Sequence, residues 1–262
     1  MRLTRRQRAR LARWAAIVVP VAVAVAFVAT ADWARIQRAF FQPEIAADLF
    51  PGIVTTGVKN TLIITGIAFA GGLVLGLVLA LMRLSTFRVY QVIATVYIEV
   101  FRGIPALVTL ILVGFAVPIA LEIRVPGRYG AAGLGLAIVA AAYMAETLRA
   151  GIQAVPRGQA EAARSLGMTS TQAMVSIVIP QAFRIIIPPL TNELVLLLKD
   201  SSLVYVLGTT AETIELSKYG RDAVSKTFNG TPITVVALLY LAVTLPLTRL
   251  AAWLERRGGV PR

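Results

Sequence analysis

The chain lacks two residue types that most catalytic and metal sites use. It contains no cysteine and no histidine among its 262 residues. Without cysteine there is neither a disulfide nor a thiolate metal site. Without histidine the commonest general base and the commonest neutral metal ligand are missing. These two absences exclude most classes of membrane metalloenzyme and serine–histidine hydrolase.

Charged residues are also scarce, at 15% of the chain, and hydrophobic residues make up 57% with a mean hydropathy of +0.76. Soluble domains average roughly 45–50% apolar and about 25% charged residues. The net charge of +13 comes largely from basic residues before the first apolar run and after the last. Such flanks mark cytoplasmic ends of membrane spans, and they present no folded basic face for nucleic acid. The composition therefore predicts a membrane protein that does not bind nucleic acid.

Several stretches are long enough to cross a bilayer, for which a helix needs about 20 apolar residues. Five contain no charged residue and a sixth contains only Glu193; they are Trp14–Ala31, Asn60–Met82, Gly103–Leu121, Tyr129–Ala145, Thr227–Thr248 and Ile185–Leu198. We expect an all-α, polytopic transmembrane helical bundle of about six spans in the cell (inner or plasma) membrane. The basic excess on alternate loops predicts cytoplasmic N- and C-termini.

The first span has two interpretations. Its basic start, apolar centre and small residues at Ala29–Ala31 are typical of a cleaved signal peptide as well as of a retained anchor. We favour the anchor, because 18 uncharged residues are long for a signal core. Within the second span, the glycines of "GGLVLG" (Gly71–Gly76) indicate either close helix packing or the ordinary glycine content of a membrane helix.

A polar stretch interrupts the apolar runs after the fourth span. Pro156 and Gly158 are expected to end the helix that leaves that span. The segment Gln159–Leu166 contains good helix formers and predicts a short helix. Gly167 stands where a glycine C-cap belongs.

A second helix is expected to begin just beyond. Thr169 followed by Gln172 fits a capping box, and the helix should run toward Ile179 until Pro180 limits or kinks it. We therefore expect two short helices joined at a glycine across the cytoplasmic membrane face. They could merely cover the bundle. Alternatively, the small surface of Ala162 and Ala163 could insert into a groove of a partner protein.

The same stretch carries a specific sequence pattern. Glu161-Ala162-Ala163, three residues, Gly167, nine residues and then Ile177-Val178-Ile179-Pro180 resembles the EAA loop of ABC importer permeases, departing only in Ile179 for a leucine. Four further segments resemble the polar amino-acid branch of that family: Asn60–Ser85, Tyr97–Leu110, Ala142–Gly167 and Pro188–Leu203. The resemblance covers about residues 57–208. Permeases of this branch often have a five-span core, so the first span resembles an addition.

The resemblance implies a division of labour among subunits. Two permease subunits, of the same or a related chain, form the pathway above an expected homodimer of ATPase subunits, and an extracytoplasmic binding protein delivers a polar amino acid. This chain has no G-x-x-x-x-G-K-[ST] sequence, so ATP and Mg are expected on the ATPase and no cofactor on this non-catalytic subunit. The residues implied to couple to the ATPase are Glu161, Ala162, Ala163, Arg164, Leu166, Gly167, Ile177 and Pro180.

We expect three regions on this basis. Residues 1–57 comprise the basic N-terminus, the additional span and an interfacial segment in contact with lipid. Residues 58–253 form the permease domain, including the coupling loop 149–184. Residues 254–262 form a cytoplasmic tail.

Polar and helix-breaking residues within spans are candidates for the pathway or a gate, because burying an unpaired charge is costly. They are Glu99, Arg102, Gly103, Pro105, Glu146, Asn192, Glu193, Lys199, Asp200 and Ser201. Glu99 with Arg102, and Lys199 with Asp200, could instead be structural ion pairs. Gly103 and Pro105 indicate either a kink facing the pathway or a simple helix start. Glu193 could receive the ammonium group of a zwitterionic substrate.

Two other functions were weighed. An ion-coupled secondary transporter of small polar solutes would need its own coupling-ion site, but the sequence shows no internal repeat and few carboxylates within spans. An intramembrane enzyme has little chemistry available without histidine, cysteine or a clustered acid pair.

Overall fold

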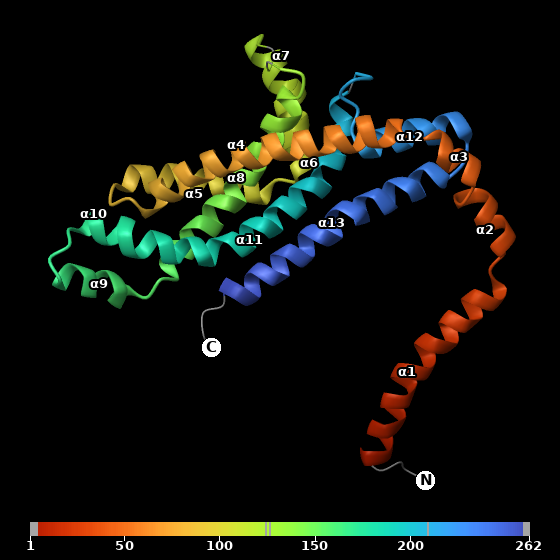
Figure 1. Cartoon of the computed structure of the whole chain (residues 1–262), viewed down its shortest axis with the longest axis horizontal. Coiled ribbons are helices and arrows are strands. Elements are labelled where there is room, and N and C mark those ends of the chain that lie inside the picture. The colour runs from red at the N-terminus through yellow and green to blue at the C-terminus, as the bar shows by residue number, and fades with distance from the viewer. Residues whose placement is uncertain (1–4, 124, 126, 209, 259–262) are drawn as a thin grey trace.

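The computed structural model describes residues 5–123, 125, 127–208 and 210–258 and shows helices joined by short connections (Figure 1). Of the expected C-terminal tail, residues 259–262 lie outside the described residues, as do residues 1–4 at the other end. The helices, with η marking π or 3₁₀ turns, are α1 (Arg5–Thr30), α2 (Trp33–Phe40), α3 (Pro43–Asp48), η1 (Ile53–Val58), α4 (Lys59–Leu84), α5 (Arg88–Gly103), α6 (Ala106–Ile111), η2 (Leu112–Ala116), α7 (Val117–Leu121), α8 (Gly130–Gln153), α9 (Arg157–Ser165), α10 (Ser170–Ala173), η3 (Met174–Val178), α11 (Ile179–Asp200), η4 (Ser201–Leu207), α12 (Leu216–Thr227) and α13 (Thr231–Gly258).

Four helical stretches are long and apolar enough to cross a membrane: Ile53–Leu84, Gly130–Gln153, Ser170–Leu207 and Thr231–Arg256. Two bent pairs bring the number to six if each counts as one span: Trp14–Thr30 with Trp33–Asp48, bent by 79°, and Arg88–Gly103 with Ala106–Leu121, bent by 108°. The all-α architecture and the number of spans predicted from the sequence are confirmed.

The α4–α8 pair is the most extensive helix contact of the bundle. A Cβ atom added at Gly72 would lie 2.8 Å from Ala140 Cβ, and one added at Gly76 would lie 3.0 Å from Met144 Cβ. The backbones can approach this closely only because these positions have no side chain. Of the two interpretations of the "GGLVLG" stretch, close packing is therefore the one observed.

The third span is broken where the sequence reads "RGIP". The helix α5 ends at Gly103 and α6 begins at Ala106, with Pro105 at its N-cap. Proline cannot continue the hydrogen-bond ladder of α5, so the chain turns by 108° here. The sequence prediction of a break is confirmed, but the two halves are much more sharply angled than a single kinked crossing.

The polar stretch after the fourth span differs from the expectation in two respects. Gly158 does not break a helix; it lies inside α9, which Pro156 caps. The second helix does not stop at Pro180 either, because the helical segment continues from Ser170 to Leu207. The π-helical turns of η3 precede Pro180, so this proline falls in the first turn of α11, where no backbone N–H is needed.

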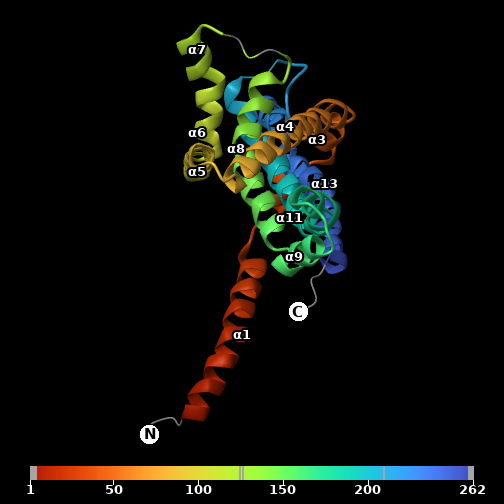
Figure 2. The ribbon, with the colours of Figure 1, turned by 90° about the vertical axis from the view of Figure 1, so that its left-hand side faces the viewer.

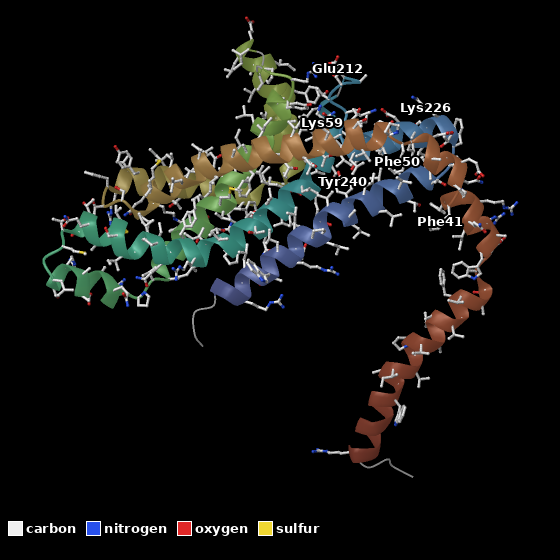
Figure 3. All side chains as sticks on the ribbon, viewed as in Figure 1. Phe41, Phe50, Lys59, Glu212, Lys226 and Tyr240 are labelled. Atoms are coloured by element: carbon white, nitrogen blue, oxygen red, sulfur yellow. The ribbon has the colours of Figure 1, made fainter. Side chains whose placement is uncertain are left out.

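The opposite end of the bundle is closed by α2, α3 and α12, where the exposed rings of Phe41 and Phe50 lie (Figure 3). This is the segment that the sequence places at the outer interface, and aromatic rings are typical of such interfaces. The connection between the last two predicted spans contains a helix, α12, that the sequence did not predict. A buried cluster of Leu49, Ile53 and Leu216 packs α3 and α12 together.

The first helix, α1, extends away from the rest of the bundle (Figures 1 and 2). Its apolar side chains between Trp14 and Val28 are exposed along the helix. The connection to the bundle is made by α2 and α3, where Gly230 N–H donates to Ala39 O at 2.7 Å and Gln42 N–H donates to Thr231 Oγ1 at 3.0 Å. An apolar helix with side chains exposed in this way is suited to lipid contact.

Candidate functional site

The helix break between α5 and α6 forms one wall of a cavity of about 410 Å³ whose other walls are α8 and α11. Its volume lies within the range of small-molecule sites. Five of the residues expected in the pathway line this cavity: Arg102, Gly103, Pro105, Glu193 and Asp200. Non-helical backbone at membrane depth is tolerated where it lines a cavity, so the break is better explained as a cavity wall than as a simple helix start.

Three ionisable side chains line the cavity. Arg102 comes from α5, while Glu193 and Asp200 lie seven positions apart, on one face of α11. Arg102 Cζ lies 5.5 Å from the ring centroid of Tyr143, a cation–π contact. The four ion pairs of the described residues include none of the three charged groups. The cavity therefore holds three charged groups that form no ion pair among the described residues.

A second cavity, of about 420 Å³, shares Arg102, Gly103 and Tyr143 with the first. Glu99 and Glu146 lie in its lining rather than in that of the first cavity. Arg102 stacked on Tyr143 stands where the two cavities meet. The expected Glu99–Arg102 ion pair does not occur among the described contacts, because Arg102 is turned toward α8.

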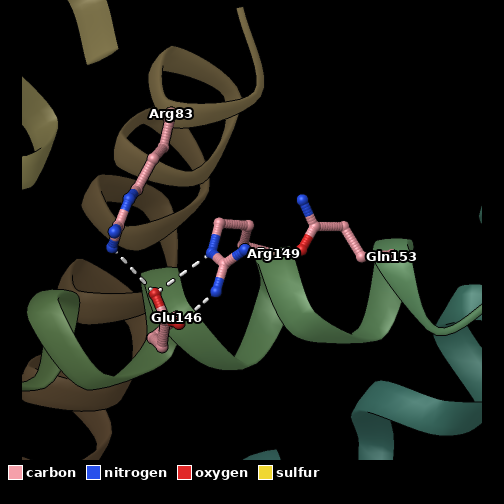
Figure 4. Close-up of polar contacts among 4 residues, drawn as sticks. All are labelled: Arg83, Glu146, Arg149 and Gln153. Atoms are coloured by element: carbon pink, nitrogen blue, oxygen red, sulfur yellow. Dashed lines mark hydrogen bonds and ion pairs between the residues drawn. The ribbon is translucent and has the colours of Figure 1, made fainter.

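Glu146 is held by a clamp between α4 and α8 (Figure 4). Its Oε2 accepts from Arg83 Nη1 at 3.0 Å and from Arg149 Nε at 3.2 Å, and its Oε1 pairs with Arg149 Nη2. Arg149 also donates to Gln153 Oε1. A carboxylate with this many cationic partners has little capacity left for a ligand, so Glu146 fixes the two helices.

The other candidate residues of α11 and η4 do not line either of these two cavities. Asn192 Nδ2 donates to Glu255 Oε1 at 3.2 Å on the α13 side. Lys199 lines a different cavity with Ser202 and Tyr240. Ser201 is buried and donates to Leu198 O at 2.7 Å. The expected Lys199–Asp200 pair is absent among the described ion pairs, because neighbours on a helix point roughly 100° apart.

Two residues of these sites were missed by the sequence analysis. Tyr143 lines both cavities and stacks on Arg102, and Arg83 completes the clamp on Glu146. Tyr143 precedes Glu146 by three positions, so the two share a helix face. That spacing within an otherwise apolar span is the signal that could have revealed the tyrosine. The partnership of Arg83 joins positions 63 residues apart, and local spacing does not reveal it.

The predicted coupling residues lie on and around α9. Glu161, Ala162, Arg164 and Gly167 are exposed, and Leu166 is 86% exposed. Ala163, in contrast, is buried against its own subunit. Ile177 and Pro180 belong to the continuous η3–α11 helix. The exposed surface of α9 therefore includes Ala162 but not Ala163, and its most prominent apolar side chain is Leu166.

Gly167 ends α9 as the sequence predicts. Its φ is +90°, and its N–H donates to Arg164 O at 3.0 Å while Met168 N–H donates to Ala163 O at 3.2 Å. This is a Schellman cap, which needs a residue in the left-handed region. The capping box between Thr169 and Gln172 is also confirmed, and it starts α10 directly after the turn.

The described residues contain no group of three or more acidic side chains that could hold a metal ion.

Residues 72–259 match the model of a protein family described as "binding-protein-dependent transport system inner membrane component". The match covers the second half of α4 and all described residues beyond it, including both cavities and α9.

Individual relatives cover most of the chain. A probable glutamine ABC transporter permease protein of Bacillus subtilis is 42% identical over 203 residues, which span 77% of this chain and 91% of the relative. An arginine transport system permease protein of Corynebacterium glutamicum is 36% identical over 247 residues, which span 88% of this chain and 75% of the relative.

A solved structure supports the same fold. The structure titled as an amino acid ABC transporter with histidines has a chain that matches with a TM-score of 0.72 and 38% identity. The match covers 80% of this chain and 96% of that one.

Proposed function

The chain belongs to the family of binding-protein-dependent transport system inner membrane components, and on that premise we propose that it forms the membrane pathway of an ATP-driven importer of polar amino acids. It is the non-catalytic permease subunit of such an importer. The names of its relatives refer to glutamine and arginine permeases of ABC transporters. The similarity to these permeases does not favour an ion-coupled secondary transporter.

One observation carries the proposed pathway. A helix broken at Gly103–Pro105 opens a cavity between membrane-spanning helices, and Arg102, Glu193 and Asp200 line it. A polar amino acid carries at least one ammonium and one carboxylate, so it needs partners of both signs, and this cavity supplies both. Charged groups between membrane helices mark solute pathways because their burial is otherwise costly.

The proposed coupling element is the exposed surface of α9. Leu166, Ala162 and the charged side chains of Glu161 and Arg164 would dock in a groove of an ATPase subunit. The rigid Schellman turn at Gly167 joins α9 to the continuous η3–α11 helix, which lines the cavity. Movement of the ATPase would thus reach Glu193 and Asp200 along one helix.

The remaining partners follow from this assignment. We propose that a homodimer of ATPase subunits binds ATP and Mg, that a second permease subunit of the same or a related chain completes the pathway, and that an extracytoplasmic binding protein delivers the solute. The N- and C-termini would be cytoplasmic, by the basic flanks of the first and last spans. Residues 1–57 would add a lipid-facing span to the permease domain, residues 58–253.

Assembly and ATP hydrolysis test this function. The complex of this permease with its ATPase, reconstituted in nanodiscs, should hydrolyse ATP faster when its binding protein and an amino acid are added. Leu166→Asp should lower co-purification of the ATPase, because a charge at the most prominent apolar side chain of the α9 surface opposes docking. Phe228→Asp is a matched control, since Phe228 is 92% exposed beyond α12. Equal ATPase recovery with Leu166→Asp and wild type would contradict the proposed docking surface.

A further inference from the structure

The charges of the central cavity are unequal in number. Its ionisable lining consists of one cation, Arg102, and two carboxylates, Glu193 and Asp200. The rest of the lining is mostly apolar, from residues such as Leu136, Val139 and Leu197. With all three groups ionised, the cavity carries one net negative charge. A charge in a low-dielectric site is costly unless a partner of opposite sign is present.

Neither carboxylate forms an ion pair with a described residue. Among the described residues, the carboxylates in ion pairs are those of Glu146, Glu212 and Asp222. Arg102 is stacked on the ring of Tyr143. Lys199, although adjacent to Asp200 in sequence, lines a different cavity with Ser202 and Tyr240. The lining of the central cavity thus has one more carboxylate than cations, and none of these groups is in an ion pair among the described residues.

The two carboxylates are also well separated. Seven residues correspond to nearly two helical turns, so Glu193 and Asp200 lie on the same face of α11, about 10.5 Å apart along its axis. Two carboxylates at this spacing can each hold one of two cationic groups that lie at opposite ends of a long molecule. They are less suited to a single ammonium group, which can contact only one of them closely.

We infer that the substrate of this pathway is a cationic amino acid with a long side chain, such as arginine or lysine, rather than a neutral or an acidic one. The inference rests on the proposed importer function. Arg102 receives the α-carboxylate, and Glu193 and Asp200 divide the α-ammonium and the side-chain cation between them. A neutral amino acid leaves one carboxylate without a partner. An acidic amino acid adds a further negative charge next to that carboxylate, and such a mismatch is a strong basis for discrimination.

Direct binding to the importer tests this inference. The complete permease–ATPase complex is placed in nanodiscs without the binding protein, so that the partner's selectivity does not contribute. Isothermal titration calorimetry then measures L-arginine, L-lysine, L-glutamine and L-glutamate. Arginine and lysine should bind on the order of tenfold or more tightly than glutamine, and glutamate should bind most weakly. Failure of both cationic amino acids to bind the wild-type complex, or equal binding of glutamine, overturns the inference.

Charge-neutralising variants locate the effect. Glu193→Gln and Asp200→Asn should each weaken arginine binding on the order of tenfold. Glutamine binding should fall comparably in the variant that loses the partner of the α-ammonium group and stay within about twofold in the other. The matched control is Glu44→Gln, because Glu44 is an exposed carboxylate of α3 outside the cavity. Unchanged arginine affinity in both cavity variants overturns the assignment of these residues. If a variant complex fails to assemble, the binding of the four amino acids to the wild-type complex decides the inference.

The outcomes separate this inference from the function on which it rests. ATP-driven uptake of glutamine or glutamate, without binding of arginine or lysine, would retain the importer and reject the cationic substrate. Absence of ATP-driven uptake for all four amino acids, with binding protein and ATPase present, would reject the importer function itself.

Discussion

At the scale of single residues, Glu215 is the least expected feature of the molecule. Its side chain is fully buried at the start of α12, where Oε1 accepts from Lys218 N–H at 2.7 Å and Oε2 accepts from Ser217 N–H at 2.6 Å. Burial raises the pKa of this carboxyl from 4.5 to about 7, although the two backbone donors lower it. The residue therefore caps a helix and also holds a proton near neutral pH.

The raised pKa predicts a dependence of stability on pH. Because the folded protein holds this proton more tightly than the unfolded chain, the contribution of Glu215 is fully present below about pH 4.5 and is lost as pH rises through about 7. The shift corresponds to about 3 kcal/mol over that range. The melting temperature of the detergent-solubilised permease, measured from about pH 5.5 to 8.5, should fall less steeply in Glu215→Gln than in wild type. Identical slopes would show that this carboxyl does not titrate there, and Glu44→Gln, exposed on α3, should keep the wild-type slope.

Gly167 supports a prediction about coupling. At φ +90° an alanine is strained by about 1–2 kcal/mol, although no atom lies within 4 Å of the added Cβ. We expect Gly167→Ala to reduce amino-acid uptake per ATP hydrolysed several-fold in proteoliposomes, because the turn between α9 and α10 loses its defined geometry. Gly158→Ala is the matched control: Gly158 lies inside α9 with equal space around it, and alanine there favours the helix. If both variants couple like wild type, the turn does not transmit movement.

At the scale of helices, the α4–α8 contact holds the bundle together. Gly72→Leu places a large side chain against Ala140, which should cost about 1–3 kcal/mol by overpacking and lower the melting temperature in detergent. At Gly66, on the same helix, an added Cβ meets no atom within 4 Å, so Gly66→Leu should change stability by less than about 0.5 kcal/mol. Equal melting temperatures for the two variants would contradict the close packing described for this pair.

The helices also show which features local sequence can predict. The break at Pro105, the cap at Gly167 and the capping box at Thr169 depend on neighbours within a few positions, and all three were predicted. Pro180 was expected to stop its helix, yet the π turns of η3 move it into a first turn where proline is tolerated. Sequence alone gave no sign of these π turns, because a π turn has no strong residue preference.

Side-chain partners were harder to predict than helices. The proposed Lys199–Asp200 and Glu99–Arg102 pairs relied on sequence proximity, whereas Arg102 stacks on Tyr143 and Glu146 pairs with Arg83 from another helix. Such partners depend on how α4, α5 and α8 pack, and spacing along one helix does not encode that. Likewise, only the three-dimensional arrangement of the helices shows that Arg102, Glu193 and Asp200 line one cavity.

At the scale of the whole molecule, the chain is a membrane subunit that depends on others for energy. Its exposed α9 surface and its cavity lie on one connected helical path, from α9 through the turn at Gly167 into α11. The sequence contains no ATP-binding loop. The central claim of this account is therefore that amino-acid movement through the cavity is driven by ATP hydrolysed on a partner.

Uptake into proteoliposomes tests that claim most directly. The complex of permease, ATPase and binding protein is reconstituted, ionophores dissipate all ion gradients, and labelled amino acid is supplied with the binding protein. Uptake should require ATP on the ATPase side and should be unaffected by the ionophores. Uptake that proceeds without ATP whenever an ion gradient is imposed, with this chain as the only protein present, would contradict the account.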